Sequence, residues 1–279
     1  MDRGLRLLRF FFVNVPYELL KDKYWDLFVS YRISPEIYFS PSLLDRWPEA
    51  EWKEMAQSLR ELGMKATFHA PFYDLSPGAL DEKIRQATLE RLVQVLELAS
   101  IFHPQAIVAH LGFDPRIHES YEEEWLENSL KTWQAIIPLL KKVGTFLNLE
   151  NVFENTPELF KKLLSKINSP YIGICFDYGH TKAFTNTGLR NWQEIFPWVR
   201  QLHLHDNQGQ KDDHWGLGKG ILDFSALFSK LKQYNCYPII TLEPHTEAAF
   251  WDTLDYLNRL PEDIYAYLEK CGQINGQIL

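Results

Sequence analysis

The sequence predicts an α/β fold, a single (β/α)8 TIM barrel over residues 1–279, with parallel strands and an active site at the C-terminal strand ends. Eight short apolar segments alternate with amphipathic stretches along the chain. This alternation is typical of parallel strands joined by helices, and eight such units fit a closed barrel. No Gly/Ser-rich linker or change of composition divides the chain. An open, doubly wound sheet is the alternative.

The strands are expected in the apolar segments, where polar residues alternate with apolar ones. We place them at residues 10–15, 35–39, 65–70, 106–110, 145–150, 171–177, 200–205 and 238–243. Side chains on a strand point to opposite faces with a period of two. In QLHLHD, Leu202 and Leu204 therefore share one face, and Gln201, His203 and His205 share the other. One face suits a layer of helices, and the other suits a polar barrel interior.

Local signals mark several helices between these strands. Residues 48–63 carry apolar side chains at helical spacing and end in Gly63, which is a helix stop signal. Ser120, followed three residues later by a glutamate, matches a capping box. Thr156 and Pro157 pair an N-cap with a proline at the first helical position. We therefore expect helices to begin at these three places.

The composition, with 46% hydrophobic and 24% charged residues, is ordinary for a soluble globular protein. A net charge of −8 and the lack of a lysine or arginine cluster weigh against nucleic acid without excluding it. Three cysteines form no paired framework, which favours a reducing, cytoplasmic location. The N-terminal apolar stretch is too short to span a membrane and lacks a signal-peptide cleavage site. The oligomeric state stays open, and a homo-oligomer is compatible with the sequence.

Carboxylate and imidazole side chains recur at or just after the predicted strand ends. These groups are the protein ligands of Zn²⁺ and related divalent ions. The C-terminal strand ends of a barrel surround one mouth, so we expect these side chains to converge. The candidate ligands are His69, His110, Glu150, Asp177, His180, His203, Asp212, His214 and Glu243. They predict a site for one to three divalent ions, which could be zinc, manganese, cobalt or magnesium.

The candidate ligands fall into three groups. The strongest group has three carboxylates and one imidazole: Glu150, Asp177, His203 and Glu243. The second group comes from loops: His180, Asp212 and His214. His69 and His110 form the third group. Buried carboxylates need partners, and a network of hydrogen bonds and ion pairs without metal is the alternative.

Substrate-binding candidates lie beside these ligands. His180 and His214 are expected to orient substrate, and Phe72 and Trp215 to form apolar walls around a small ligand such as a sugar. His205 is a further candidate. Because it shares a face with His203, the period of two leaves open which of the two is the metal ligand. His245, two residues after Glu243, is a weaker candidate for a substrate contact at the mouth.

The segment GLGKG, residues 216–220, lacks the spacing of the known phosphate-binding glycine motifs. Nucleotide binding is therefore not favoured. We interpret the segment as a tight turn that brings Asp212 and His214 over the barrel mouth.

Taken together, these residues resemble the xylose isomerase-like barrel superfamily, which contains sugar isomerases and epimerases together with endonuclease IV. The resemblance covers nearly the whole chain. Its most specific segments are LENVFE, FDYGH, HLHDNQGQKDDHWGLGKGILDF and TLEP. The H-x-x-D form of His203 to Asp206 resembles the strand-seven motif and favours His203 over His205 as the ligand.

The resemblance implies two ligand sets. In the epimerases, one metal is held by the residues that match Glu150, Asp177, His203 and Glu243. The two glutamates there also act as acid and base on opposite faces of the substrate carbon. In endonuclease IV, all nine candidate positions carry ligands, for three zinc ions.

The leading hypothesis is a divalent-metal-dependent isomerase or epimerase that acts on a sugar, sugar phosphate or polyol. Proton transfer would pass through a metal-stabilised enediolate, with Glu150 and Glu243 removing and returning the proton. An endonuclease IV-like, multinuclear zinc phosphodiesterase that acts on abasic DNA is the first alternative. A non-catalytic sugar-binding barrel is the second. The residues do not identify the substrate, the metal or the number of ions.

Overall fold

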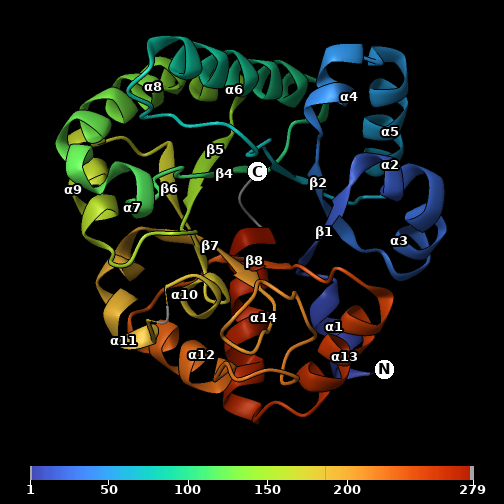
Figure 1. Cartoon of the computed structure of the whole chain (residues 1–279). Coiled ribbons are helices and arrows are strands. Elements are labelled where there is room, and N and C mark those ends of the chain that lie inside the picture. Colours follow the sequence, from blue (N-terminus) through green and yellow to red (C-terminus); the bar gives the residue numbers. More distant parts are fainter. Residues whose placement is uncertain (1, 186, 277–279) are drawn as a thin grey trace.

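The computed structural model describes residues 2–185 and 187–276, and within them eight parallel strands close into a barrel (Figure 1). Each strand pairs with the next, and β1 pairs with β8. The strands are β1 (Phe12–Pro16), β2 (Ser34–Tyr38), β3 (Thr67–His69), β4 (Ala106–His110), β5 (Phe146–Glu150), β6 (Ile172–Asp177), β7 (Val199–Leu204) and β8 (Ile239–Leu242). The closed barrel is confirmed, and the open sheet is excluded.

Helices surround this barrel (Figure 1). None of those in the described ranges is both long and apolar enough to cross a membrane. The helices are α1 (Arg3–Leu8), α2 (Tyr17–Leu19), η1 (Leu20–Tyr24), α3 (Trp25–Tyr31), α4 (Pro41–Arg46), α5 (Glu49–Glu61), α6 (Glu82–Phe102), α7 (Pro115–His118), η2 (Glu119–Tyr121), α8 (Glu122–Val143), α9 (Glu158–Ile167), α10 (His180–Ala183), α11 (Leu189–Trp192), η3 (Gln193–Trp198), α12 (Phe224–Gln233), α13 (Glu247–Asn258) and α14 (Glu262–Gly276).

The three predicted helix boundaries agree with the structure to different degrees. Helix α5 follows Pro48, and Gly63 beyond its end has a positive φ of 64°, as a stop signal requires. The capping box at Ser120 is wrong, because that residue lies inside η2 and α8 starts without a side-chain cap. Helix α9 begins after Pro157 rather than at it, and the Thr156 hydroxyl accepts a long hydrogen bond of 3.5 Å from the backbone of Glu158.

The N-terminal strand starts later than predicted. Residues 3–8 form α1, because the Asp2 carboxylate accepts from the backbone of Leu5 and caps this short helix. Phe10 and Phe11 then donate backbone hydrogen bonds back to α1, so pairing with β2 begins only at Phe12.

The barrel interior is polar beneath its mouth, as the strand alternation predicted. The centre of this layer is Glu36 of β2, which is fully buried. Its carboxylate accepts hydrogen bonds of 2.5–3.1 Å from Asn14, Thr67, Gln201 and Thr241, which lie on four other strands. A buried carboxylate is stable only when it is satisfied in this way. This layer of hydrogen-bonded polar side chains therefore lies under the C-terminal strand ends.

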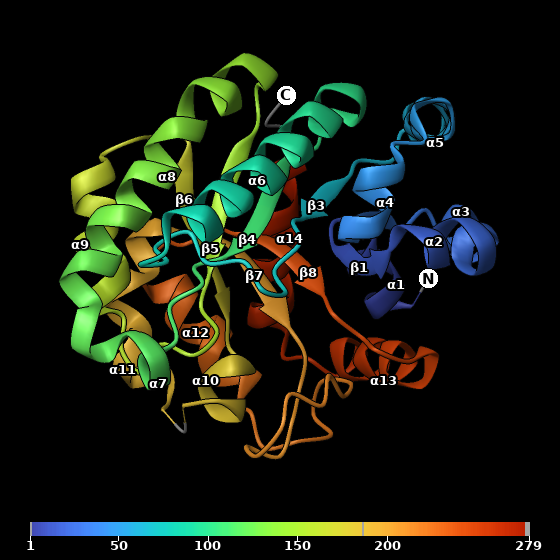
Figure 2. The same cartoon turned by 45° about the horizontal axis from the view of Figure 1, so that its top comes forward.

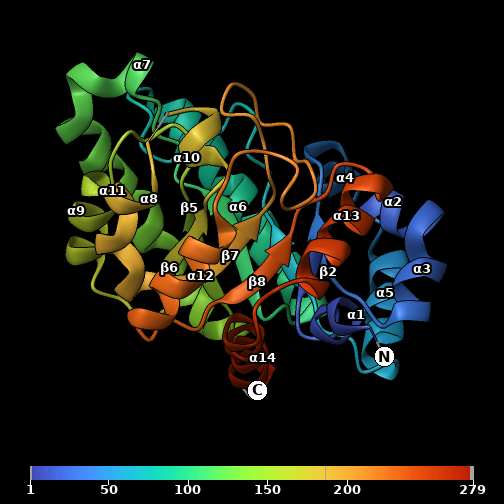
Figure 3. The same ribbon diagram turned by 90° about the horizontal axis from the view of Figure 1, so that it is seen from below.

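The loops that follow the strands gather at one end of the barrel. Helices α7 and α10 and the long loop between β7 and α12 lie at this end (Figure 2). Helix α14 reaches the opposite end (Figure 3). The predicted ligands sit at or just beyond the strand ends on the α7 and α10 side, so this end is where a site can form.

Candidate metal and active site

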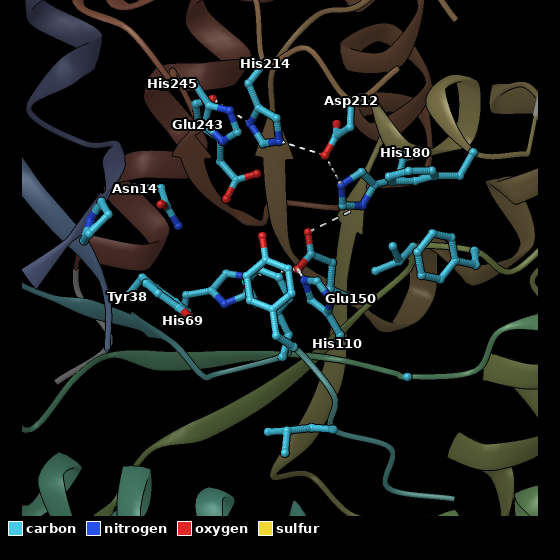
Figure 4. A pocket seen from close by; sticks show the side chains of 18 of the residues that line it. Asn14, Tyr38, His69, His110, Glu150, His180, Asp212, His214, Glu243 and His245 are labelled. Atoms are coloured by element: carbon cyan, nitrogen blue, oxygen red, sulfur yellow. Dashed lines mark hydrogen bonds and ion pairs between the residues drawn. The ribbon is translucent and has the colours of Figure 1, made fainter. Parts of the chain in front are cut away.

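A cavity of about 1410 Å³ opens at the C-terminal strand ends. Figure 4 shows imidazole and carboxylate side chains that converge in it from several strands and loops. Seven of the nine predicted ligands line the cavity: His69, His110, Glu150, His180, Asp212, His214 and Glu243. The other two, Asp177 and His203, are fully buried and contact lining residues. The structure therefore brings all nine together.

Glu150, the last residue of β5, lies at the centre of the group. Its Oε2 is 3.1 Å from Nε2 of His69 and 3.3 Å from Nε2 of His110. Its Oε1 is 2.9 Å from Nδ1 of His203 and 3.8 Å from Nδ1 of His180. One carboxylate thus faces four imidazoles and links the three predicted groups.

The strongest predicted group is compact and buried. Nδ1 of His203 lies 2.9 Å from Glu150 and 3.2 Å from Glu243, so one imidazole nitrogen contacts both glutamates. Glu150, Asp177, His203 and Glu243 each offer one ligand atom within 4.8 Å of the others, and all four are buried. Nε2 of His203 points the other way and lies 3.0 Å from Glu36. The two nitrogens of this imidazole thus face carboxylates on opposite sides, with Glu36 on one side and the two glutamates on the other.

The loop-borne group also converges. Oδ2 of Asp212 lies 3.0 Å from Nε2 of His214 and 3.3 Å from Nε2 of His180, the contacts drawn in Figure 4. In both histidines, Nδ1 donates to a backbone carbonyl: that of Asn151 for His180, and that of Glu243 for His214. His69 has the same arrangement, with Nδ1 donating to a backbone carbonyl at 2.9 Å. A carbonyl on one ring nitrogen leaves the other nitrogen free to bind a cation.

The two histidines of β7 and its loop belong to different groups. His203 joins Glu150 and Glu243, whereas Nε2 of His205 lies 3.0 Å from Asp177 and 3.5 Å from Asp212. His205 offers a ligand atom to the His180, Asp212 and His214 group. It is buried and does not line the cavity. The period of two correctly placed both imidazoles in the interior, and the loop geometry then separated them.

Electrostatics couple these carboxylates and imidazoles. Burial by itself raises the pKa of Glu150, but His203 and His110 hold that pKa well below its usual value. Burial also raises the pKa of Glu243, yet His203 lowers it to about 2. Burial lowers the pKa of His214, but its hydrogen bond to Asp212 and the nearby Glu243 raise it to about 8. The imidazoles beside these carboxylates thus hold their pKa values low, so both carboxylates are charged.

These residues fit divalent metal ions. Carboxylate and imidazole form the donor set that zinc and its neighbours accept. Oδ1 of Asp212 and Nδ1 of His205 are buried without a hydrogen-bond partner, so the group at Asp212 has unused donor and acceptor capacity. Neither lysine nor arginine lies within 4 Å of the cluster carboxylates among the residues described. A divalent cation would supply the missing positive charge.

The comparisons with known proteins agree with the barrel fold. The sequence model of the Xylose isomerase-like TIM barrel family matches residues 35–261. The chain belongs to this family. The uncharacterized protein MJ1311 of Methanocaldococcus jannaschii is 31% identical over 63% of this chain, and the match spans 62% of that relative.

Two solved structures resemble the whole barrel of this xylose isomerase-like chain. A D-tagatose 3-epimerase-like protein is 25% identical, with a TM-score of 0.74, and the match covers 95% of this chain and 98% of that one. The TTHB071 protein from Thermus thermophilus, soaked with ZnCl₂, is 26% identical, with a TM-score of 0.72, and the match covers 93% of this chain and 96% of that one. Similarity over nearly the full length means that the barrel of this family member has a counterpart in both proteins.

Two other residues of this xylose isomerase-like site were not predicted. Glu36 shares the polar face of β2 with Tyr38, so the same alternation that identified the other strands could have found both. The Tyr38 ring stands edge-on to His69, with centroids 6.1 Å apart, and lines the cavity.

His245, the weaker candidate for a substrate contact, does line the mouth, where it stacks on His214 with centroids 3.7 Å apart. No sequence pattern indicates that stacking, because the two rings come from different loops.

Of the two residues predicted to form apolar walls, one lines the cavity and the other does not. Phe72 lines the cavity and stacks on His110, with ring centroids 4.3 Å apart. Trp215 does not line the cavity, because its backbone pairs with Asp206 in an isolated β-bridge and its side chain is 38% exposed elsewhere. The site therefore keeps Phe72 as a wall and has no place for Trp215.

Proposed function

We propose that the chain is a divalent-metal-dependent isomerase or epimerase that acts on a sugar or polyol. The observation that carries the proposal is that Glu150 and Glu243 both approach Nδ1 of His203, at 2.9 and 3.2 Å, so the two carboxylates converge on one point beside the cavity. The two glutamates come from β5 and from the end of β8, and both line the cavity. Two carboxylates that face one substrate carbon can exchange a proton on opposite sides of it. The likeness to a D-tagatose 3-epimerase-like protein supports the same reaction class.

Each residue has a defined task in this proposal. Glu150, Asp177, His203 and Glu243 would hold the metal, which when bound supplies Lewis-acid polarisation of adjacent substrate oxygens. One glutamate, as the carboxylate, would take the proton from the C–H bond. The other, after taking up a proton from the cavity solvent, would deliver it to the opposite face or to the neighbouring carbon. His180 and His214 orient the substrate hydroxyls from the side.

Carboxylate-to-amide exchange tests these roles. Glu150→Gln and Glu243→Gln should each lower turnover at least about a hundredfold, because a positioned acid or base contributes about 10² to 10⁴ in rate. Exchange of the substrate C–H proton with D₂O, followed by NMR, reads the proton-transfer step directly. Glu262→Gln is the control, because that side chain is 83% exposed and pairs only with Arg3 among the described residues. Turnover and exchange at wild-type rates in either amide variant would refute the proposal.

Hydrolysis of a phosphodiester by a multinuclear site is the second candidate. It is favoured by the adjoining metal-binding groups, which include His69, His110 and Glu150, and separately His180, His205, Asp212 and His214. Nicking of an abasic duplex, with binding that weakens steeply as salt rises, would establish it. If neither nicking nor salt-dependent binding occurs, this candidate fails. Saturable sugar binding without turnover of any tested sugar would instead indicate a non-catalytic barrel.

A further inference from the structure

The cavity is larger than a single sugar needs when it is bound to the carboxylates and imidazoles at the cavity floor. Binding sites for drug-sized molecules usually enclose about 300 to 1000 Å³, whereas this cavity encloses about 1410 Å³. The carboxylates and imidazoles occupy the floor, as Figure 4 shows. The remaining wall is built mostly from apolar and aromatic side chains. A free monosaccharide would contact the floor and leave most of this wall in water.

The apolar wall has two parts. One comes from α2, α3 and α13 and includes Leu19, Leu27 and Phe250. The other comes from the loop before α6, from α6 itself and from α7, and includes Leu80 and Ile117. Helices α3 and α13 lie across the barrel from α7 (Figure 1). Apolar surface therefore extends from the floor in two directions.

Exposed apolar side chains are concentrated at this wall. Fourteen large hydrophobic residues are exposed in the described chain, and seven of them line the cavity. Ile117 is 69% exposed and Tyr73 is 70% exposed, which is costly unless a ligand covers them. Exposed apolar side chains that gather around one cavity in this way indicate a binding site.

The wall offers no cation for a phosphate. None of the described lining residues is lysine or arginine. Cations beside the rim already have partners. Lys23 contacts Glu247 at 3.3 Å and Arg116 contacts Asp114 at 2.6 Å. Arg85 donates to the backbone carbonyls of Ala79 and Leu80. Proteins bind phosphate with arginine, lysine or helix N-termini. A phosphorylated sugar would therefore find no lysine or arginine on the described wall. The N-terminus of α13 reaches the cavity at Thr246, but its first turn carries the acidic Glu247.

We propose that the substrate is an uncharged sugar or polyol joined to an apolar aryl or alkyl group. The hydroxyls lie on the carboxylate and imidazole floor, and the apolar group covers the wall at Leu80 and Ile117. This inference rests on the proposed function, because it assigns the hydroxyl-bearing part to the reacting floor. It narrows the substrate class by excluding sugar phosphates.

Calorimetry on the full chain tests the inference without requiring turnover. A panel of hexoses is presented in three forms: the free sugar, its 6-phosphate and its phenyl glycoside. At least one phenyl glycoside should bind about ten times more tightly than the free sugar, a difference of about 1.4 kcal/mol. Its binding should also show a more negative heat-capacity change, as burial of apolar surface requires. A 6-phosphate that binds as tightly as the phenyl glycoside, or a panel that does not bind at all, would overturn the inference.

Variants of the wall locate the apolar group. Ile117→Asp and Leu80→Asp should each weaken phenyl glycoside binding at least about fivefold and leave free-sugar binding unchanged, because each removes apolar contact with the aryl group alone. Ile221→Asp is the matched control, because Ile221 is 55% exposed but does not line the cavity. Unchanged glycoside affinity in both wall variants would contradict the inference. Turnover of free sugars without selective glycoside binding refutes the inference alone, whereas selective glycoside binding without any turnover refutes only the proposed function.

Discussion

Replacement of Asp206 by asparagine should loosen the loop that carries Asp212 and His214, two of the nine candidate ligands. Asp206 is fully buried after β7. Its carboxylate accepts four backbone N–H groups: those of Asn207, Gly218, Gly220 and Leu222, at 2.8–3.2 Å. These contacts close residues 206–222 into a tight loop that presents Asp212 and His214 to the cavity. The interpretation of GLGKG as a tight turn is confirmed, since Gly218 has a positive φ of 78° and a Cβ at Gly220 would collide with the carboxylate of Asp206.

The magnitude follows from the number of donors. Asparagine keeps one acceptor oxygen but turns an amide NH₂ toward two backbone N–H groups. The loss of two hydrogen bonds to a charged group costs about 1.5 kcal/mol each at the lower end of the measured range. We therefore expect Asp206→Asn to lower the free energy of unfolding by about 3 kcal/mol. The matching fall in melting temperature is roughly 6 to 12 °C for a chain of this size.

Equilibrium urea unfolding measures this loss, and bound-metal analysis measures its effect on the site. Asp252→Asn is the control, because Asp252 pairs with Lys219 of the same loop only at the surface. Such a surface pair contributes less than about 1 kcal/mol. If Asp206→Asn unfolds within about 0.5 kcal/mol of the wild type, well below the cost of one such hydrogen bond, the four N–H contacts do not organise the loop as described.

Two further predictions concern the interior. Burial raises the pKa of Glu154 from its usual 4.5 to about 7, so the native state keeps a proton between these pH values that the unfolded chain has released. The free energy of unfolding should therefore fall as pH rises through this window. In urea unfolding with chelator, the free energy of unfolding of Glu154→Gln, relative to that of the wild type, should increase by about 3 kcal/mol from about pH 4 to about pH 8. A stability difference that is the same at both pH values would argue against this titration. Protein purified without chelator should carry at least one divalent ion per chain by mass spectrometry, and Asp177→Asn should reduce that count while His103→Ala, outside the cavity, should not. Wild-type protein that takes up no zinc, manganese, cobalt or magnesium would exclude a metal site.

The strand pattern alone placed much of the site. Parallel strands of a closed barrel all end at one mouth, so residues at the ends of predicted strands had to converge. Glu150 and His110 both end their strands and both face the cavity. The period of two was equally reliable, since it placed His203 and Gln201 together in the polar interior.

The same reasoning failed where a residue's role depends on partners across the barrel. Glu36 lies in a short apolar segment, and nothing local shows that four other strands supply its hydrogen bonds. Trp215 follows two ligands closely in the chain, yet the bridge to Asp206 turns it away from the cavity. Ser120 carries a valid capping pattern, but a 3-10 turn takes up that segment first.

The sequence by itself determined the barrel, its polar interior and the nine candidate ligands, because alternation along each strand and the common end of parallel strands are local properties. Only the tertiary structure decided that Glu150 links the ligand groups and that His205 contacts Asp177 and Asp212 rather than the two glutamates beside His203. It also decided that the described cavity wall is mostly apolar and lacks lysine and arginine. Those features depend on side chains from loops far apart in the chain. Closure of the barrel brings these side chains together, and this closure cannot be read from any single segment of the sequence.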